Sequence, residues 1–430
     1  MKRVLILHYH EIWLKGGNKN YFLSRLRDAV RQSVEDLPVA ALESISERLI
    51  LTPGDDAALP RILERLRRVF GLAYIAPARE VPSALEALGP AACEMMAEAN
   101  PRNFAVRVKI ADSAYGMNSM ELERELGRRV LEHLRAREAS VRVKLQEPEV
   151  TCQVELVPGG RALIYAQRVE GPGGLPAVTS GRLVALLSGG FDSSVAAYKM
   201  MRRGCHLTFA HFFGNPSPSG NPSSAVAEDL VRMLTPYQFT SRLYRIPFDA
   251  VQRQIVAGVH ESYRVLLYRR MMARIAREIA RGERALGLVT GDSVSQVASQ
   301  TLHNLMAIDQ GIDLPVYRPL AGDDKAEILR LARQIGTYEI SCEPFEDCCP
   351  RFMPRAPAIF ARPQELDEAE CRLDIDALVR LGLEGATCVD YKFARGEVTA
   401  HEASPRRIAN RRAEKKAVEV QPAAHDTASN

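Results

Sequence analysis

The run Ser188-Gly189-Gly190-Phe191-Asp192-Ser193 combines small, hydroxyl and acidic residues in an order that suits phosphate binding. It lies between the apolar run Leu183–Leu187 and a segment predicted to be helical. Two glycines let the backbone approach an anion without a Cβ in the way. The N–H groups of such a turn point at one spot, and the helix start favours negative charge there. Ser188 and Ser193 add hydroxyl donors, and Asp192 is a candidate ligand for the Mg²⁺ that accompanies a nucleotide.

The run differs from the G-x-x-x-x-G-K-[ST] phosphate loop because no lysine follows its glycines. We therefore expect it to bind pyrophosphate rather than a γ-phosphate that is transferred. A simpler interpretation is a tight strand–helix turn in which Asp192 and Ser193 only cap the helix. The complete run, placed between a strand and a helix, favours the phosphate site.

The elements around this run predict a doubly wound α/β domain. Leu183–Leu187 is apolar without alternation, which is typical of a parallel strand covered on both faces. A helix to about Arg203, its stop at Gly204 and the apolar run His206–Phe213 complete a strand–helix–strand unit. In such domains ligands bind at the carboxyl ends of the strands.

Two smaller units precede this domain. The first, residues 1–59, has a strand at Val4–Leu7 and then a helix with apolar residues every fourth position, which predicts a small α+β sandwich. The second, residues 60–170, is expected to hold a helix with an apolar face, strands near 104–110, 141–145 and 152–156, and a helix over 119–137. The glycine-rich linker Gly171–Pro176 separates it from the domain at 176–397. Residues 398–430 are charged and are expected to be a disordered tail.

Composition limits the function without fixing it. The 430 residues are 46% hydrophobic and 26% charged, which is typical of a globular protein. The net charge of +4 is too mild to require a nucleic-acid partner, so an RNA-binding surface must be local. No apolar run approaches the roughly 18 residues of a membrane span, so we expect no membrane partner. The eight cysteines include no C-x-x-C pair, which favours reduced thiols in the cytoplasm.

Several motifs narrow the interpretation further. The Ser188–Ser193 run resembles the loop of the PP-loop ATP pyrophosphatases, and the chain from residue 1 to about 355 resembles the tRNA 4-thiouridine synthetases, or tRNA uracil 4-sulfurtransferases. The motifs that carry the resemblance are His8–Glu11, Asn118–Leu122, Gly171–Pro176, Thr290–Ser293, Gln296–Thr301, Gly336–Ile340 and Glu346–Cys349. Three residues differ from the usual motifs of this family: His10 replaces a glycine, Phe191 replaces an isoleucine and Ser194 replaces a proline.

The resemblance implies a ferredoxin-like N-terminal domain, a THUMP RNA-binding domain and a Rossmann-like PP-loop domain with a parallel sheet. It also implies ATP and Mg²⁺ as cofactors. The implied ATP-binding residues are Leu186, Leu187, Ser188, Gly189, Gly190, Asp192, Ser193, His211, Phe212, Arg269, Gly291 and Gln300. Core packing is an alternative role for Phe212, and a solvated helix face is an alternative for Arg269.

The reaction implied by the resemblance is an exchange of oxygen for sulfur at carbon 4 of uridine 8 in tRNA. The oxygen is a poor leaving group, so the family adenylates it and then displaces AMP with sulfur. Cys349 matches the family's catalytic cysteine, and Cys205 or Cys342 is the expected resolving thiol. Lys325 matches a family lysine, although a surface lysine at a helix start is an equal alternative.

The partners implied are tRNA and a persulfide donor, such as a cysteine desulfurase or a separate rhodanese. About thirty residues follow Glu397, so we expect the form without a rhodanese domain. Transfer of sulfur to the thiamine sulfur-carrier protein and a homodimeric state are further implications of the resemblance. Basic side chains of the second unit are expected to contact tRNA phosphates: Arg61, Arg65, Arg68, Arg128 and Arg129.

Two other functions compete with this one. A PP-loop synthetase or amidotransferase would adenylate a carboxylate, but the sequence has no glutaminase-like region and the THUMP-like unit would serve no purpose. A non-catalytic RNA-binding protein would not need the intact Ser188–Ser193 run or Cys349.

Overall fold

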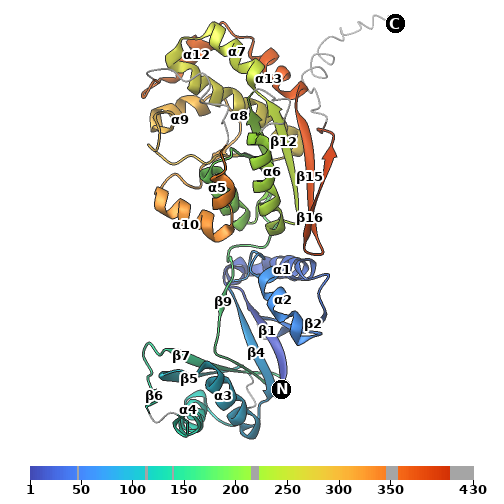
Figure 1. Cartoon of the computed structure of the whole chain (residues 1–430), viewed down its shortest axis with the longest axis vertical. Coiled ribbons are helices and arrows are strands. Elements are labelled where there is room, and N and C mark those ends of the chain that lie inside the picture. The colour runs from blue at the N-terminus through green and yellow to red at the C-terminus, as the bar shows by residue number, and fades with distance from the viewer. Residues whose placement is uncertain (46–47, 112–114, 138–139, 215–221, 345–356, 407–430) are drawn as a thin grey trace, which may run out of the picture.

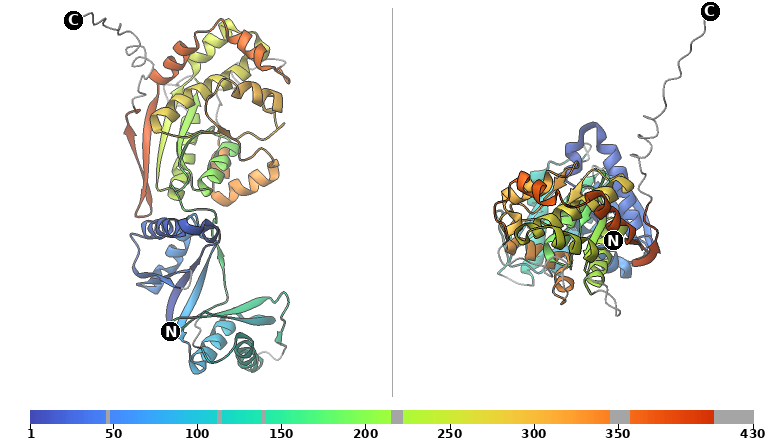
Figure 2. Two further views of the ribbon diagram at one scale, coloured as in Figure 1. Left: turned by 180° about the vertical axis from the view of Figure 1, so that it is seen from behind. Right: turned by 90° about the horizontal axis from the view of Figure 1, so that it is seen from above.

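The computed structural model describes residues 1–45, 48–111, 115–137, 140–214, 222–344 and 357–406. Its three units follow one another along the long axis of an elongated molecule (Figure 1). The C-terminal α/β domain lies at one end, the unit with α1 and α2 lies in the middle, and the unit with α3 and α4 lies at the other end. The view from behind shows the same stacking (Figure 2).

The N-terminal unit is a sheet with helices on one face. Its elements are β1 (Lys2–His8), a 3-10 helix (Glu11–Asn18), α1 (Lys19–Ser33), β2 (Val39–Ile45), β3 (Arg48–Pro53), a 3-10 helix (Asp56–Ala58), α2 (Leu59–Leu66) and β4 (Tyr74–Pro82). β1 pairs with β3 and β4, both antiparallel. Alternate strand residues such as Leu5 and Leu51 pack against Leu26 of α1 and Ile62 of α2, as a two-residue period on one covered face requires.

The predicted division at residues 59 and 60 falls at the first residue of α2. The buried Ile62 and Leu66 of this helix pack in the same core as Leu5, Leu26 and Leu51. α2 therefore packs with the first unit, and the core of the second unit begins with Val81 near the end of β4.

The second unit extends the same sheet. It contains α3 (Leu85–Ala99), β5 (Asn103–Ile110), α4 (Ser119–Arg135), β6 (Arg142–Val143), β7 (Val150–Val157), β8 (Arg161–Tyr165) and β9 (Val169–Glu170). The nine-stranded sheet has the order β2-β3-β1-β4-β8-β7-β5-β6, and β9 pairs with β4. A capping box between Asn118 and Glu121 begins α4, because each side chain accepts from the backbone N–H of the other residue.

The third unit is the predicted doubly wound domain. Its first half contains β10 (Arg182–Leu186), α5 (Phe191–Arg202), β11 (His206–Phe213), α6 (Pro222–Leu234), a 3-10 helix (Thr235–Tyr237), β12 (Thr240–Pro247), α7 (Asp249–Gly258), a 3-10 helix (Glu261–Tyr263) and α8 (Arg264–Glu283). Its second half contains β13 (Leu288–Val289), a 3-10 helix (Ala298–Gln300), α9 (Leu302–Asp309), β14 (Val316–Tyr317), α10 (Lys325–Ile335), α11 (Tyr338–Ser341), α12 (Pro363–Glu370), α13 (Ile375–Glu384), β15 (Thr387–Ala394) and β16 (Glu397–Ala403). The strand order is β14-β13-β10-β11-β12-β15-β16.

Helices cover both faces of this sheet, as the apolar run of β10 predicts. Val184 faces a core with α7, α8 and α13, whereas Leu183 and Ala185 face a core with α5, α6 and α10. β10 to β14 are paired in parallel, so their carboxyl ends lie at one edge. That edge carries the loop between β10 and α5.

The prediction of a tail from residue 398 is wrong for its first residues. Glu397–Ala403 form β16, which pairs antiparallel with β15, and β15 pairs antiparallel with β12. Residues 407–430 lie outside the described part of the chain. Among the described residues, no helix has the length and apolar character needed to cross a membrane.

Candidate active site

The predicted phosphate loop joins the end of β10 to the start of α5. The Ser193 hydroxyl lies 3.1 Å from the backbone N–H of Ser188 and from the carbonyl of Gly190. The Ser188 hydroxyl accepts from the N–H of Gly190 at 3.2 Å. Gly190 is the N-cap of α5, and no side chain caps the helix there. The two serines thus shape the turn and leave the helix start without the side-chain cap that the simpler interpretation requires.

Asp192 connects this loop to a second helix. Its carboxylate lies 2.7 Å from Lys325 Nζ and accepts from the Gln296 amide at 3.1 Å. Lys325 is the first residue of α10, directly after the N-cap Asp324. Its ammonium group also lies 5.4 Å from the centre of the Phe191 ring. Lys325 is therefore beside the loop, where a basic group can meet phosphate.

A cavity of about 410 Å³ opens at this edge of the sheet. Nine of the predicted ATP-binding residues line it: Leu186, Leu187, Ser188, Asp192, Ser193, Phe212, Arg269, Gly291 and Gln300. Phe212, Leu266 and Met272 form part of an apolar wall, and Asp192 and Arg269 are charged. An apolar cavity with a few polar groups at one end suits a nucleotide, whose base is flat and whose phosphates are anionic.

Asp292 organises the polar end of the cavity. This buried carboxylate pairs with Arg269 and with Arg318 Nε at 3.2 Å, and it accepts hydrogen bonds from Thr290 and Gln300. Burial would raise the pKa of Asp292, but Arg269, Thr290 and Arg318 outweigh burial and hold the pKa below its ordinary value. The sequence motif contained Asp292, but the prediction gave it no role.

Three predicted ATP-binding residues, Gly189, Gly190 and His211, do not line the cavity. The glycines belong to the backbone of the loop. The His211 ring is buried, with Nδ1 2.9 Å from the Leu187 carbonyl and Nε2 2.7 Å from the Ser223 hydroxyl. The ring therefore holds the backbone of a cavity residue instead of facing a ligand.

Gly291 lines the cavity, and its lack of a side chain has a further reason. A Cβ at this position would lie 2.6 Å from the backbone nitrogen of Ser193 and 2.7 Å from the carbonyl carbon of Asp192. The strand end that carries Gly291 thus packs directly on the phosphate loop, and only glycine allows this approach.

The two unusual residues of the loop helix both contact the start of α11. The Phe191 ring stacks on Tyr338 with 5.3 Å between ring centres. The Ser194 hydroxyl lies 3.2 Å from the Thr337 hydroxyl, and both side chains are buried. These contacts fix α11 against the helix that begins at the phosphate loop.

The predicted sulfur-carrying cysteine, Cys349, lies outside the described residues. Cys342 is exposed and caps the C-terminal end of α11. Cys205 is buried, burial raises the pKa of its thiol, and it precedes β11. Since the cavity lies at the carboxyl end of β11, Cys205 is at the opposite end of the sheet. The structure therefore places Cys205 away from the cavity, whereas Cys342 is exposed at the end of α11.

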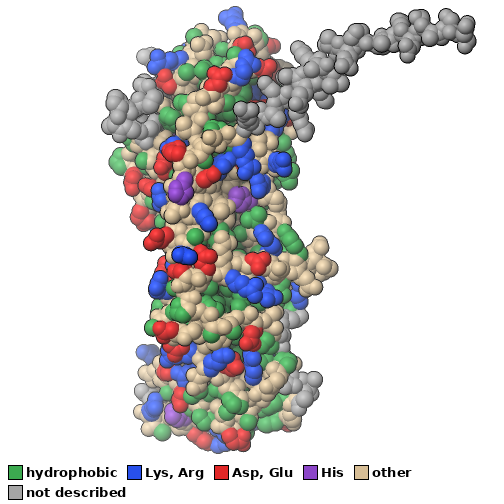
Figure 3. Space-filling model, turned by 90° about the vertical axis from the view of Figure 1, so that its right-hand side faces the viewer, with side chains coloured by type: hydrophobic (Ala, Val, Ile, Leu, Met, Phe, Trp, Pro, Cys, Tyr) green, Lys and Arg blue, Asp and Glu red, His purple; other side chains and the backbone are tan. Residues whose placement is uncertain are grey.

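The arginines predicted to contact tRNA are paired with acidic residues. Arg128 contacts Glu125 and Glu132, and Arg129 also contacts Glu125. Figure 3 shows that acidic and basic side chains are interspersed on one face of the molecule. Ion pairs of this kind reduce the local positive potential that a phosphate backbone would meet.

Arg65 is mostly buried, contrary to its predicted role as an exposed RNA contact. Only 12% of its side chain is exposed, and its guanidinium group pairs with Asp36 and lies 5.5 Å from the centre of the Phe393 ring. Arg61 lies 3.7 Å from Asp36 and is exposed. Arg65 thus joins the N-terminal unit to the β15–β16 hairpin.

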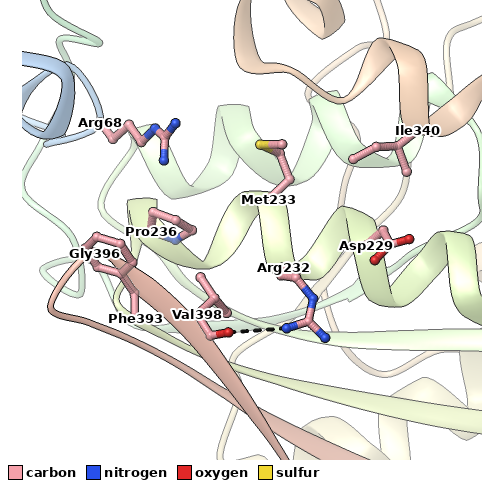
Figure 4. A pocket seen from close by; sticks show the side chains of 9 residues that line it. All are labelled: Arg68, Asp229, Arg232, Met233, Pro236, Ile340, Phe393, Gly396 and Val398. Carbon is pink, nitrogen blue, oxygen red and sulfur yellow. Dashed lines mark hydrogen bonds between the residues drawn. The ribbon is translucent and has the colours of Figure 1, made fainter.

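Arg68 lines a second cavity, of about 300 Å³, at the junction of α2, α6, α11 and the β15–β16 hairpin (Figure 4). Its wall also contains Arg232, which donates to the Val398 carbonyl, and Asp229. None of the predicted ATP-binding residues lines this cavity. It is therefore separate from the nucleotide cavity.

A group of aromatic and basic side chains lies at the junction of the two N-terminal units and was not predicted. The exposed Arg168 lies over Tyr74 at 4.7 Å and near Tyr165 at 5.9 Å from the ring centres. His8 stacks on Tyr74 at 4.2 Å, and the exposed His10 meets the edge of the same ring. Such rings and cations are the groups that contact unpaired RNA bases and phosphates.

The comparisons agree with this geometry. A family model described as thiamine biosynthesis protein (ThiI) matches residues 178–375, a ThiI ferredoxin-like domain matches 4–76, and a THUMP domain matches 83–165. A probable tRNA sulfurtransferase from Thermus thermophilus is 43% identical over 391 residues, covering 91% of this chain and 94% of the relative. The chain belongs to the tRNA sulfurtransferase family.

Two further matches support the membership in the tRNA sulfurtransferase family. A probable tRNA sulfurtransferase from Moorella thermoacetica is 38% identical and covers 88% of this chain and 95% of the relative. The crystal structure of a 4-thiouridine synthetase–RNA complex with bound ATP has a TM-score of 0.79 and 31% identity, covering 90% of this chain and 99% of that chain. The predicted family and the predicted fold class are both confirmed.

Proposed function

We propose that this tRNA sulfurtransferase adenylates the carbon-4 oxygen of uridine 8 in tRNA and replaces that oxygen with sulfur, giving 4-thiouridine. The observation that carries the proposal is the Asp192–Lys325 pair beside the phosphate loop, at the mouth of a cavity with one apolar wall. The similarity to a 4-thiouridine synthetase with ATP and RNA supports the same assignment.

In the first step the uridine oxygen attacks the α-phosphorus of ATP, and the bond to the β-phosphate oxygen breaks. The departing pyrophosphate carries negative charge, which the N–H groups of the loop and the start of α5 stabilise. Ser188 contributes a hydroxyl donor, Ser193 holds the loop backbone through the Gly190 carbonyl, and Lys325 and Arg269 contribute positive charge near the loop. These groups are already in place, so little reorganisation is needed during the reaction.

Asp192 suits a Mg²⁺ ion that is held mainly by ATP. Mg²⁺ usually keeps several waters and takes one or two protein carboxylates together with substrate phosphates. Asp192 is the carboxylate in the first turn of α5 and lines the cavity. The ion would offset phosphate charge, and Lys325 and Gln296 would keep the Asp192 side chain oriented.

In the second step a persulfide on Cys349 supplies the sulfur. Its terminal sulfur attacks carbon 4, and AMP leaves with the former uridine oxygen. The thiolate of Cys342 then attacks the Cys349 sulfur, which breaks the sulfur–sulfur bond and releases 4-thiouridine as a thiolate. The resulting Cys342–Cys349 disulfide is returned to two thiols by an external thiol reductant. The exposure of Cys342 favours it over the buried Cys205 for this role.

The acceptor RNA needs a surface apart from the nucleotide cavity. The side chains around Tyr74, namely His8, His10 and Arg168, suit contact with unpaired nucleotides better than the ion-paired Arg128 and Arg129 do. Three points stay predictions. They are a cysteine desulfurase or free rhodanese as the sulfur donor, the thiamine sulfur-carrier protein as a second sulfur acceptor, and a homodimeric state of this protein.

The test is incubation with unmodified tRNA, Mg-ATP and a persulfide donor, followed by nucleoside analysis and measurement of AMP. The proposal predicts 4-thiouridine and AMP in equal amounts. Cys349→Ser should abolish 4-thiouridine while pyrophosphate release continues. AMP without any thiolated base would favour a synthetase that adenylates a carboxylate, and the absence of both products would favour an RNA-binding protein.

A further inference from the structure

The side chain of Asn304 joins two segments that are distant in the sequence. Asn304 lies on α9 and is fully buried. Its amide nitrogen donates to the carbonyl of Ala298 at 2.7 Å and to the carbonyl of Ala358 at 2.9 Å. Its amide oxygen accepts from the N–H of Ala361 at 2.8 Å. Both N–H hydrogens and the oxygen therefore have partners in the backbone.

Both of these segments form walls of the nucleotide cavity. Ala298 and Ala358 each line it. Thr301, the N-cap of α9, adds a hydrogen bond of 2.7 Å to the carbonyl of Ile359. The N–H of Ala358 also donates to the carbonyl of Ser262, another residue of the cavity wall. Asn304 thus sets the spacing between two walls without facing the cavity itself.

The segment that contains Ala298 also contacts Arg269, a charged residue of the site. Arg269 donates to the carbonyl of Ser299 at 2.8 Å and pairs with Asp292. A shift of the 298–300 segment would therefore move an acceptor that orients the Arg269 guanidinium group. The same segment contains Gln300, which donates to Asp292.

The chemistry of the contacts requires an amide. An aspartate has nearly the same shape, but it would direct carboxylate oxygens at the two carbonyls and donate to neither. An aliphatic side chain would leave two carbonyls and one N–H buried without partners. An alanine would remove the link and leave a void.

We propose that Asn304 is a positioning residue for ATP binding, which acts by holding the 298–300 and 357–361 segments in register around the cavity. The inference rests on the proposed function for the identity of the nucleotide. It assigns no contact between Asn304 and ATP.

The chain offers a matched control at the far end of the same sheet. Gln238 is also a buried amide, and it donates to the Leu207 carbonyl at 2.9 Å and the Ser241 hydroxyl at 2.8 Å while accepting from the N–H of Leu207 at 2.8 Å. Leu207 lies near the amino end of β11, away from the cavity. Gln238→Glu therefore causes the same loss of amide donors with no effect on the cavity walls.

The test measures the Kd of ATP by equilibrium dialysis, together with thermal melting, for the full chain and the variants Asn304→Asp and Gln238→Glu. We expect both variants to melt at lower temperature, but only Asn304→Asp to raise the Kd of ATP, by about tenfold or more. An equal Kd in the two variants would overturn the proposal. If either acidic variant fails to fold, the Kd of ATP and the melting temperature are measured for Asn304→Ala and Gln238→Ala instead. The same comparison between these two variants then decides whether Asn304 is a positioning residue.

The outcome is separable from that of the proposed function. Failure of the unaltered protein to form 4-thiouridine would contradict the proposed reaction, whatever the Kd values are. A raised Kd for ATP in Asn304→Asp alone would still establish the positioning role. Unchanged ATP binding with full 4-thiouridine formation would leave the reaction intact and remove the role of Asn304.

Discussion

Lys325 Nζ lies 2.7 Å from Asp192 Oδ1, which links the first residue of α10 to the first turn of α5. The Asp324–Glu327 capping box fixes where α10 begins, and the Phe191 ring lies beneath the ammonium group. The fold therefore brings a lysine from a distant part of the chain to the side of the phosphate loop.

Replacing Lys325 should slow the first chemical step. We expect Lys325→Ala to lower kcat/KM for tRNA-dependent pyrophosphate release by about 100-fold or more, because a charge that stabilises the departing pyrophosphate is removed. The measurement is pyrophosphate release under steady-state conditions. Arg330→Ala, on the same helix with 77% of its side chain exposed, is the control and should change the rate less than twofold. A similar effect of both changes would exclude a specific role for Lys325.

A methyl group at residue 291 should disturb the phosphate loop. The Cβ in Gly291→Ala would lie 2.6 Å from the Ser193 backbone nitrogen, so the loop or the strand end must move. We expect weaker ATP binding, measured as Kd by calorimetry. Gly322→Ala is the control, because a Cβ there has no neighbour within 4 Å. Equal ATP affinity in the two variants would show that the close approach is unimportant for the site.

Arg65 should contribute to stability more than to RNA binding. Arg65→Ala removes the Asp36 ion pair and the contact with Phe393, so we expect the melting temperature to fall by several degrees, at about 2–4 °C for each kcal/mol lost. Arg61 is an exposed residue on the same helix and serves as the control. The melting temperature of the Arg61→Ala variant should lie within about 1 °C of that of the unaltered protein. Weaker tRNA binding with unchanged melting would mean that Arg65 reaches RNA after all.

His8 should make the N-terminal sheet sensitive to acid. Burial and the nearby positive charges of Arg48, Arg168, His10 and Lys109 lower the pKa of His8 to about 3 from the ordinary 6.5. In the unfolded chain His8 becomes protonated below pH 6.5, whereas in the folded chain it stays neutral down to about pH 3. The free energy of unfolding therefore decreases as the pH falls through this range.

His8→Phe should therefore show a smaller drop in melting temperature between pH 7.5 and pH 5.5 than the unaltered protein shows. The phenyl ring can still stack on Tyr74, which makes it a conservative change. The measurement is thermal melting at the two pH values. Parallel drops in both proteins would contradict the assignment of the acid sensitivity to His8.

The two candidate resolving thiols should behave differently. We expect Cys342→Ser to stop 4-thiouridine formation after at most one turnover, because the carrier thiol cannot be freed, while Cys205→Ser keeps multiple turnovers. The raised pKa of Cys205 and its burial disfavour its thiolate. The measurement is 4-thiouridine per enzyme under single and multiple turnover. Loss of turnover in Cys205→Ser alone would reverse the assignment.

The sequence was most informative where chemistry and local structure depend on consecutive residues. The serines, glycines and Asp192 of the run connect the end of a buried strand to the first turn of a helix, as the run predicted. The apolar run of β10 likewise predicted a strand with helices on both faces. In these cases the motif and the strand and helix beside it are formed by neighbouring residues, so a short stretch of sequence predicts both.

The errors concern contacts between residues that are distant in the sequence. The apolar face of α2 predicted a helix, but nothing in that face identifies the sheet that it covers. The arginines of α2 suggested a basic surface because the partners Asp36 and Phe393 come from other segments. β16 was missed because it is an edge strand that buries little, and its charged residues are typical of a solvated tail.

Transfer of an isotope tests the central claim most directly. tRNA with ¹⁸O at carbon 4 of uridine 8 is incubated with the protein, Mg-ATP and a persulfide donor, and the AMP is analysed by mass spectrometry. Because adenylation forms a bond between the uridine oxygen and the α-phosphorus, the account predicts one ¹⁸O atom in AMP for each 4-thiouridine formed. Formation of 4-thiouridine with unlabelled AMP, and with the label in water, would contradict it.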